Sequence, residues 1–293
     1  MSQEPCVLPE SIRSTATALL DLVRSFSLSE YGIALGGAHA KRTADDESDV
    51  DLYLFATAAR PNEERAHLAA AFSPEVENVV CWGEDTLFSQ AGTDFRFRGR
   101  QIECWLRNAA HIDETIAACQ AGVVRRELVT WTTTGFYNHC CLSDVKAMMP
   151  LADPTGILTR WQSQVAAYPP KLRRSIIGQH LAAARFWPHN FHYRSAVARA
   201  DVIYVTGIVQ QVVHNLVQVL FALNETYFPG DKKLDEALGH LPCQPTGLRE
   251  RVASLLWPGA PATVALLDRQ QEEVKALLRE VEALVAAELG VRV

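Results

Sequence analysis

Two aspartates, Asp49 and Asp51, open an apolar run in the first fifth of the chain. Side chains on a β-strand alternate between its two faces, so this spacing places both carboxylates on one face and Val50, Leu52 and Leu54 on the other. Carboxylates held that close repel each other, and a divalent cation relieves the repulsion. Mg²⁺ suits such a site, because it prefers oxygen ligands and usually keeps waters or substrate phosphates.

A glycine pair, Gly36 and Gly37, lies upstream, directly after an apolar segment at residues 31–35 that is typical of a strand. Glycine lets the backbone approach a ligand with no side chain in the way. We expect exposed N–H groups there, together with Lys41 and Arg42, to hold the phosphates of a nucleotide. The alternative for the two cations is a solvated turn offset by the acidic residues that follow. The combined pattern predicts metal-assisted phosphoryl or nucleotidyl transfer.

The sequence from Leu35 to Phe55 resembles the nucleotidyltransferases of the DNA polymerase beta superfamily. It shares their glycine pair and their Ser-Asp-x-Asp before an apolar strand, here Ser48 to Asp51. The small-molecule branch, which includes kanamycin and lincosamide nucleotidyltransferases, is the most similar in layout. One departure is Ala38, where the family usually has serine, and it removes one phosphate or metal contact. The resemblance implies two Mg²⁺ ions, ATP as the nucleotide donor, and release of pyrophosphate.

Sites of this kind generally take a third carboxylate from a neighbouring strand, and Glu103 is the candidate. The apolar residues beside it alternate with it, so it points away from the core. We expect Glu103 to complete the metal site or to accept the proton of the attacking hydroxyl. The alternative is a solvated glutamate paired with Arg96 or Arg98, and Asp85 and Asp94 are weaker substitutes for the third ligand.

Two further residues of the motif are predicted to contact the nucleotide. His39 directly follows the glycines and is expected to touch a phosphate or the base, with a surface histidine as the alternative. Ser48 is assigned to the nucleotide site, with capping of the turn before the strand as the alternative. The full nucleotide-binding prediction is Gly36, Gly37, His39, Lys41, Arg42 and Ser48.

The order of the predicted elements gives an α+β fold with two domains. With 293 residues the chain is long enough for two cores. We predict a nucleotidyltransferase domain at residues 1–150, a mixed sheet flanked by helices, and a helical bundle at 151–293. The expected helices are 9–26, 61–72, 111–129, 157–167, 171–186, 195–223 and 261–289, and the expected strands are 31–35, 49–55, 76–82 and a hairpin at 94–106 that turns at Arg98-Gly99-Arg100.

The helical half is expected to supply the acceptor pocket. In the predicted helix from Asp201 to Leu223, a polar stripe at three- and four-residue spacing consists of Tyr204, Gly207, Gln211, His214 and Gln218. The alternatives to a pocket wall are a buried hydrogen-bond network and a dimer seam. The residues assigned to the acceptor are Asp201, Tyr204, Gln211, His214 and Lys232. The last helix has an apolar face that is consistent with either a monomer or a homodimer.

The composition limits the binding partners and the cellular compartment that we expect for this protein. The formal net charge is −6, which argues against a nucleic-acid partner. The first residues lack a secretory pattern, and the most apolar segment, at 202–223, carries several polar residues, so we expect a cytoplasmic protein outside the membrane. The favoured function is transfer of a nucleoside monophosphate to a hydroxyl of a small molecule such as an antibiotic. The alternatives are nucleotidylation of a protein or RNA, or a nucleotide-binding protein that has lost catalysis.

Overall fold

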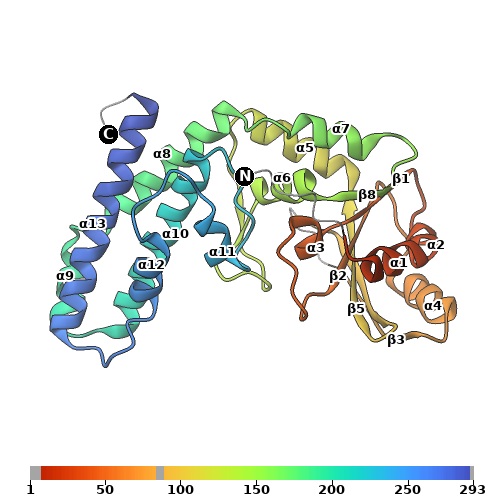
Figure 1. The fold of residues 1–293 in the computed structure, drawn as a ribbon, viewed down its shortest axis with the longest axis horizontal. Helices are drawn as coiled ribbons and strands as arrows, with labels where there is room; N and C mark the ends of the chain where they lie inside the picture. The colour runs from red at the N-terminus through yellow and green to blue at the C-terminus, as the bar shows by residue number, and fades with distance from the viewer. Residues whose placement is uncertain (1–7, 84–88, 291–293) are drawn as a thin grey trace. The chain divides into compact units, whose positions relative to one another are not determined.

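The computed structural model describes residues 8–83 and 89–290, so Asp85 lies outside the described residues. The chain forms two compact units (Figure 1). The first runs to Cys119 and resumes with Arg125–Ala167, and the second comprises Gln120–Val124 and the chain from Tyr168 onward. In the described residues the first unit holds a mixed sheet with helices and the second holds helices, which confirms the α+β class.

The sheet of the first unit has six strands in the order β3-β4-β5-β2-β1-β8. The strands are β1 (Tyr31–Leu35), β2 (Val50–Ala56), β3 (Val76–Gly83), β4 (Ala91–Phe97), β5 (Arg100–Asn108) and β8 (Met149–Ala152). β2 and β5 pair in parallel, and the other neighbours pair antiparallel. β8 was not predicted, because Pro150 and the breakers after it favoured a loop. Proline is tolerated there because β8 is at the edge of the sheet.

One face of the sheet packs on the helices α1 (Glu10–Ala18), α2 (Leu20–Ser25) and α4 (Asn62–Phe72) (Figure 1). This face carries the alternate apolar side chains, which are all buried: Ile33, Leu35, Val50, Leu52, Leu54, Phe95, Ile102, Cys104 and Leu106. The predicted alternation is therefore confirmed. The predicted helix over 9–26 is divided into two helices at Leu19, where φ is −92° and ψ is −4°.

The β4–β5 hairpin turns where the sequence predicted it. Arg98 and Gly99 both have positive φ, +53° and +77°, as the two central residues of a type I′ turn require. Glycine meets this requirement without strain. Arg98 is held by an ion pair between its Nε and Glu75 Oε2 at 3.0 Å.

The opposite face of the sheet contacts α3 (Gly37–Lys41), α6 (Asn138–Ala147) and α7 (Ile157–Gln164). Trp161 of α7 is fully buried against Phe55, and its indole N–H donates to Asp113 Oδ1 at 2.8 Å. Asp113 belongs to α5 (Ala109–Gln120). The predicted helix over 111–129 is wrong beyond Gln120. Gly122 has φ at +84°, and a two-stranded sheet of β6 (Arg126–Glu127) and β7 (Phe136–Tyr137) follows.

The second unit is built around α10 (Val202–Leu223), which packs against α8 (Pro170–Phe186), α9 (Phe191–Ala198), α12 (Leu248–Leu256) and α13 (Val264–Leu289). A short helix, α11 (Leu234–Gly239), contacts α12. The predicted single helix over 195–223 is wrong, because Ala200 has φ at +52° and separates α9 from α10. α10 is long and apolar enough to cross a membrane, but 72% of its apolar window is buried inside the unit, as in a core helix.

A buried group of charges ties α3 and α6 to the sheet. Lys41 Nζ lies 2.7 Å from Asp144 Oδ1, and Arg107 Nη2 lies 3.1 Å from Asp144 Oδ2. The Arg107 guanidinium also stacks over the Tyr53 ring, 3.8 Å from its centroid. Burial alone would raise the pKa of Asp144, but the charges and hydrogen bonds of the two cations hold it below its ordinary value. Asp144 is therefore ionised and compensated.

Removing Asp144 tests how much this group contributes to stability. Asp144→Ala leaves the fully buried Arg107 without its carboxylate, and we expect a loss of about 3–5 kcal/mol in the free energy of unfolding. The matched control is Glu64→Ala, which removes an exposed ion pair with Arg60 and should cost at most about 1 kcal/mol. Urea unfolding measures both, and hydrogen exchange of β5 and α6 amides locates the loss. Similar losses in the two variants would contradict the prediction.

Candidate metal centre

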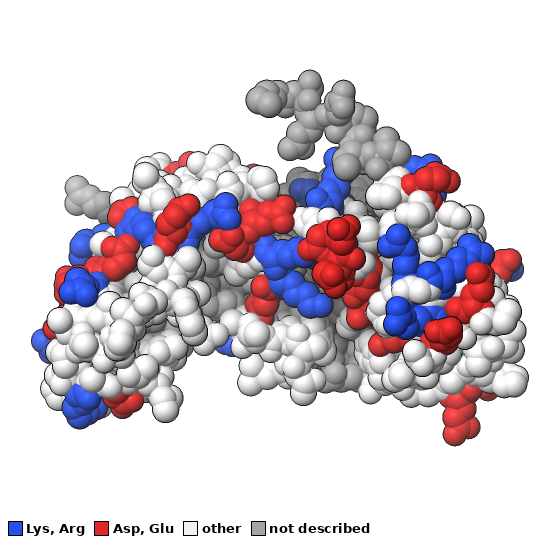
Figure 2. All heavy atoms as spheres, turned by 60° about the horizontal axis from the view of Figure 1, so that its bottom comes forward, with Lys and Arg blue, Asp and Glu red and all other residues white. Residues whose placement is uncertain are grey.

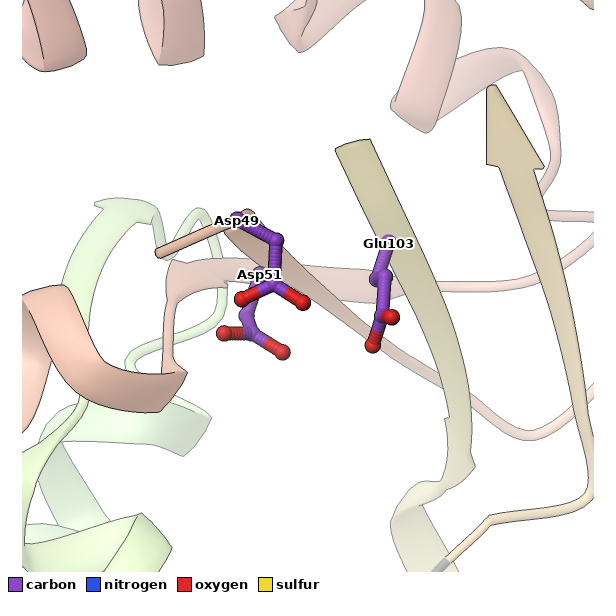
Figure 3. Close-up of side chains that lie close together, drawn as sticks. All are labelled: Asp49, Asp51 and Glu103. Carbon is purple, nitrogen blue, oxygen red and sulfur yellow. The ribbon is translucent and has the colours of Figure 1, made fainter. Parts of the chain in front are cut away.

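The three predicted carboxylates come together on the face of the sheet opposite α1, α2 and α4. The parallel register of β2 and β5 sets Asp51 directly beside Glu103, and Asp49 immediately precedes β2. One carboxylate oxygen from each residue lies within 4.8 Å of the other two. All three side chains point to the same side of the strands and are half-buried (Figure 3).

Burial and the neighbouring negative charges both shift the pKa of Glu103. Burial raises the pKa of Glu103 to about 7, with further contributions from the negative charges of Asp49, Asp51 and Asp94. Burial also raises the pKa of Asp94, against a hydrogen bond from Trp82 that lowers it. Four carboxyl groups therefore share a small, partly dehydrated region, and their mutual repulsion favours either a proton or a cation.

The donor set fits a hard divalent cation. Three carboxylate groups supply oxygen ligands, which Mg²⁺ prefers, and no thiol or imidazole belongs to the group that converges here. Three protein ligands are fewer than the six of an octahedral ion, so the remaining positions suit waters or the phosphates of a substrate. Asp49, Asp51 and Glu103 are the residues that would hold such an ion.

Glu103 is not paired with an arginine of the hairpin. Arg98 pairs with Glu75, and Arg96 Nη2 donates to the carbonyl of Gly99 at 2.8 Å. The side chain of Glu103 instead accepts a hydrogen bond from the indole Nε1 of Trp105 at 3.2 Å. The alternative of a glutamate neutralised across the hairpin therefore does not describe this structure.

The glycine pair makes room for the carboxylate and for a tyrosine. A Cβ on Gly37 would lie 1.6 Å from Asp51 Oδ2, and a Cβ on Gly36 would lie 2.0 Å from the Tyr53 ring. Gly37 also has φ at +55°, which glycine adopts without strain. The amide of Gly36 donates to the Asp51 carbonyl and that of Gly37 to the Tyr53 hydroxyl, each at 2.9 Å. These two N–H groups, expected to be exposed for phosphate, are therefore engaged within the protein.

Two of the predicted nucleotide contacts have partners inside the first unit. Lys41 pairs with Asp144, and its side chain is 24% exposed. Ser48 closes the turn before β2, since its hydroxyl donates to Asp45 Oδ1 at 2.8 Å and accepts from the Asp45 amide at 2.9 Å. The turn-capping alternative for Ser48 is therefore present. Nucleotide binding by Lys41 and Ser48 stays a prediction.

The remaining two predicted contacts flank the glycine pair. His39 is half-buried within α3. Arg42 is exposed and ends α3 with φ at +62°. Both lie on the short connection between β1 and β2, so the connection that seats Asp51 also carries them. Their contact with a nucleotide stays a prediction.

The polar stripe of α10 is engaged largely within the second unit. Gln211 Oε1 accepts a hydrogen bond from Trp187 Nε1 at 2.8 Å, and the His214 ring lies 6.1 Å from that of Phe228. Tyr204 contacts the Trp187 ring edge-on and is 41% exposed. These contacts match the alternative of a hydrogen-bonded, packed stripe, and acceptor binding by these residues stays a prediction.

The other two predicted acceptor residues have simple local settings. Asp201 caps α10, because its carboxylate accepts a hydrogen bond from the Tyr204 amide at 3.3 Å. Lys232 is exposed in the segment before α11. Neither position identifies a ligand, so acceptor binding by Asp201 and Lys232 also stays a prediction.

Sequence reasoning missed the residues that support the carboxylates. Trp105 and Arg107 lie on the same strand face as Glu103, two and four residues further along β5, and this spacing could have identified them. Asp144 gave no such signal, because α6 was not predicted and its contact with Arg107 spans 37 residues. The support is therefore a long-range property of the fold.

Comparison with known proteins gives limited matches. Residues 137–234, a third of the chain, match a family described as a domain of unknown function (DUF4037), and no curated protein matches. A nucleotidyltransferase-like protein from Exiguobacterium sibiricum 255-15 has a solved structure with 11% sequence identity and a TM-score of 0.44, over 95% of this chain and 78% of that one. Fold and site together define a two-unit α+β protein with a candidate carboxylate metal centre.

The pKa of Glu103 predicts a pH dependence of stability in the absence of metal. Folding raises this pKa from 4.5 to about 7, so the folded state holds an extra proton between these values and its stability falls as pH rises through them. Glu103→Gln removes this dependence, so the variant should gain stability over wild type as pH rises toward 8. Urea midpoints of both proteins at several pH values measure the difference. A constant difference would contradict the raised pKa, and added Mg²⁺ should narrow it.

Gly37→Ala tests the seating of Asp51. The new Cβ must displace the carboxylate, so we expect loss of divalent-cation binding, measured with Mn²⁺ as the probe. The control is Gly156→Ala, which has the same left-handed backbone with φ at +73° but nothing within 4 Å of the new Cβ. Both variants carry a strain of about 1–2 kcal/mol. Equal Mn²⁺ affinities in the two would show that Gly37 does not seat the carboxylate.

Proposed function

We propose that this protein is a magnesium-dependent nucleotidyltransferase that moves a nucleoside monophosphate from ATP to a hydroxyl of a small molecule. The observation that carries the proposal is that carboxylate oxygens of Asp49, Asp51 and Glu103 converge within 4.8 Å, with Asp51 and Glu103 on the adjacent parallel strands β2 and β5 and Asp49 just before β2. The glycine-to-aspartate motif that seats them supports the same chemistry, as does its resemblance to the DNA polymerase beta superfamily. The bond that forms joins the acceptor oxygen to the α-phosphorus, and the bond that breaks releases pyrophosphate.

The chain's own residues divide the work. Asp49 and Asp51 hold the cation, which when bound supplies positive charge to the triphosphate and to the leaving pyrophosphate. Glu103 either completes that set or accepts the proton of the acceptor hydroxyl. Burial and the neighbouring negative charges raise the pKa of Glu103 to about 7 while no cation is bound, and a cation held by Asp49 and Asp51 would lower it. Arg42 is exposed at the end of α3, between the glycine pair and Asp49, and we assign it to contact with a phosphate.

Surface charge supports a small acceptor over a polyanion. Basic and acidic side chains are interspersed on the face shown in Figure 2, and the formal net charge is −6. A nucleic-acid partner is usually met by a continuous basic surface. Binding of a small hydroxyl compound does not require a continuous basic surface, and we propose such a compound as the acceptor.

Charge-removing variants test the assignment of the site. Asp49→Asn and Asp51→Asn should each lower magnesium-dependent pyrophosphate release by a factor of about 10²–10³, because each removes a charge that stabilises the reacting phosphates. Pyrophosphate release is measured with ATP, Mg²⁺ and a panel of hydroxyl compounds that includes aminoglycosides and lincosamides. Calorimetry with ATP and Mg²⁺ reports binding in parallel.

The matched control is Asp46→Asn, an exposed aspartate in the same connection. It removes the same charge a few residues from the motif and should leave both readouts unchanged. Pyrophosphate release that persists in Asp49→Asn and Asp51→Asn would refute the site. Wild-type protein that binds no nucleotide with Mg²⁺ would refute the function.

A further inference from the structure

Two rows of side chains run next to each other across the face of the sheet that carries the carboxylates. In the acidic row, Glu103 of β5 lies between two carboxylate neighbours: Asp94 is opposite it on β4, and Asp51 is opposite it on β2. The second row lies two residues away along each strand, about 6.7 Å. In it Trp82, Gly92, Trp105 and Tyr53 are aligned on β3, β4, β5 and β2.

The indoles of the second row are fixed to the acidic row. Trp105 Nε1 donates to Glu103 Oε2 at 3.2 Å, and Trp82 Nε1 donates to Asp94 Oδ2 at 2.8 Å. The two rings meet edge-to-face with centroids 4.8 Å apart. Gly92 lies between them, and a Cβ there would lie 2.2 Å from the Trp82 ring. The sheet thus holds two indoles rigidly with their N–H edges on carboxylates of the candidate site.

A third tryptophan extends this aromatic cluster outward. Trp131, in the connection between β6 and β7, has its ring centroid 5.9 Å from that of Trp105 and 5.2 Å from that of Phe136. Its side chain remains 38% exposed. We call Trp82, Trp105 and Trp131 the tryptophan surface. An aromatic ring that is held by neighbouring rings and partly exposed is suited to stacking with a planar ligand.

We propose that the tryptophan surface binds the base of the nucleotide whose phosphates meet Asp49 and Asp51. The inference rests on the proposed function and adds the part of the site that recognises the donor. The tryptophan surface adjoins the carboxylates, because Trp105 donates to Glu103 and its ring contacts that of Trp131. Tyr53, at the other end of the row, is buried and covered by the Arg107 guanidinium, whereas Trp131, next to Trp105, is 38% exposed.

The test separates binding of the base from binding of the phosphates. Calorimetry with Mg²⁺ compares ATP with inorganic tripolyphosphate on wild type, Trp131→Ala, Trp131→Leu and Trp131→Phe. Base stacking typically corresponds to a change of roughly 5- to 150-fold in affinity, so ATP should bind more weakly to the Ala and Leu variants by that factor. Trp131→Phe keeps an aromatic face and should retain most of the affinity. Tripolyphosphate should bind all four proteins equally.

Trp257→Ala is the matched control, because Trp257 is 84% exposed in the second unit and should not affect ATP binding. Thermal unfolding checks each variant, and if Trp131→Ala fails to fold, the Phe and Leu pair decides. Unchanged ATP affinity in Trp131→Leu, with binding lost in Asp49→Asn/Asp51→Asn, would overturn this inference and leave the proposed function standing. Equal weakening of ATP and tripolyphosphate would also overturn it. Failure of ATP to bind wild type would overturn both.

Discussion

The parallel pairing of β2 and β5 is the constraint on which the site depends. It sets Asp51 beside Glu103, an arrangement that electrostatic repulsion opposes. The opposite face of the same two strands is buried, with Val50 paired to Ile102. A slip of one residue would turn those apolar side chains outward, so burial fixes the register. Burial of the apolar face therefore holds together carboxylates that would otherwise move apart. A bound cation would reduce the repulsion between them.

The shell around the carboxylates is built from close contacts that leave little freedom. Gly37 gives Asp51 its space, and Tyr53 is fixed between the Gly37 amide and the Arg107 guanidinium. Asp144 compensates Arg107 and Lys41 together. These contacts connect α3 and α6 with each other and with the strand pair, so segments far apart in the sequence hold the carboxylates in place. Such preorganisation is what electrostatic catalysis requires, because the charges need not move when the substrate reacts.

Features that depend on residues close together in the sequence could be predicted. Strand alternation placed Asp49, Asp51 and Glu103 on one face, and Arg98-Gly99 identified the hairpin turn. Contacts between distant segments could not be predicted from the sequence, so α6 and β8 were missed. Local propensity also failed at Leu19 and Ala200, where helical composition continues through a break in backbone geometry. The glycine pair was predicted to let the backbone approach a ligand closely, but the groups it approaches are Asp51 and Tyr53 of the protein, which spacing alone does not reveal.

The position of β8 in the chain has a consequence for synthesis. β8 is the outer neighbour of β1, yet it comes more than a hundred residues later in the sequence. While the ribosome is still making the segments between them, one edge of β1 has no partner, and its sequence, Tyr-Gly-Ile-Ala-Leu, is mostly apolar. Exposed apolar edges are templates for misassociation. This edge of β1 therefore stays open to misassociation until residues 149–152 have been made and pair with it.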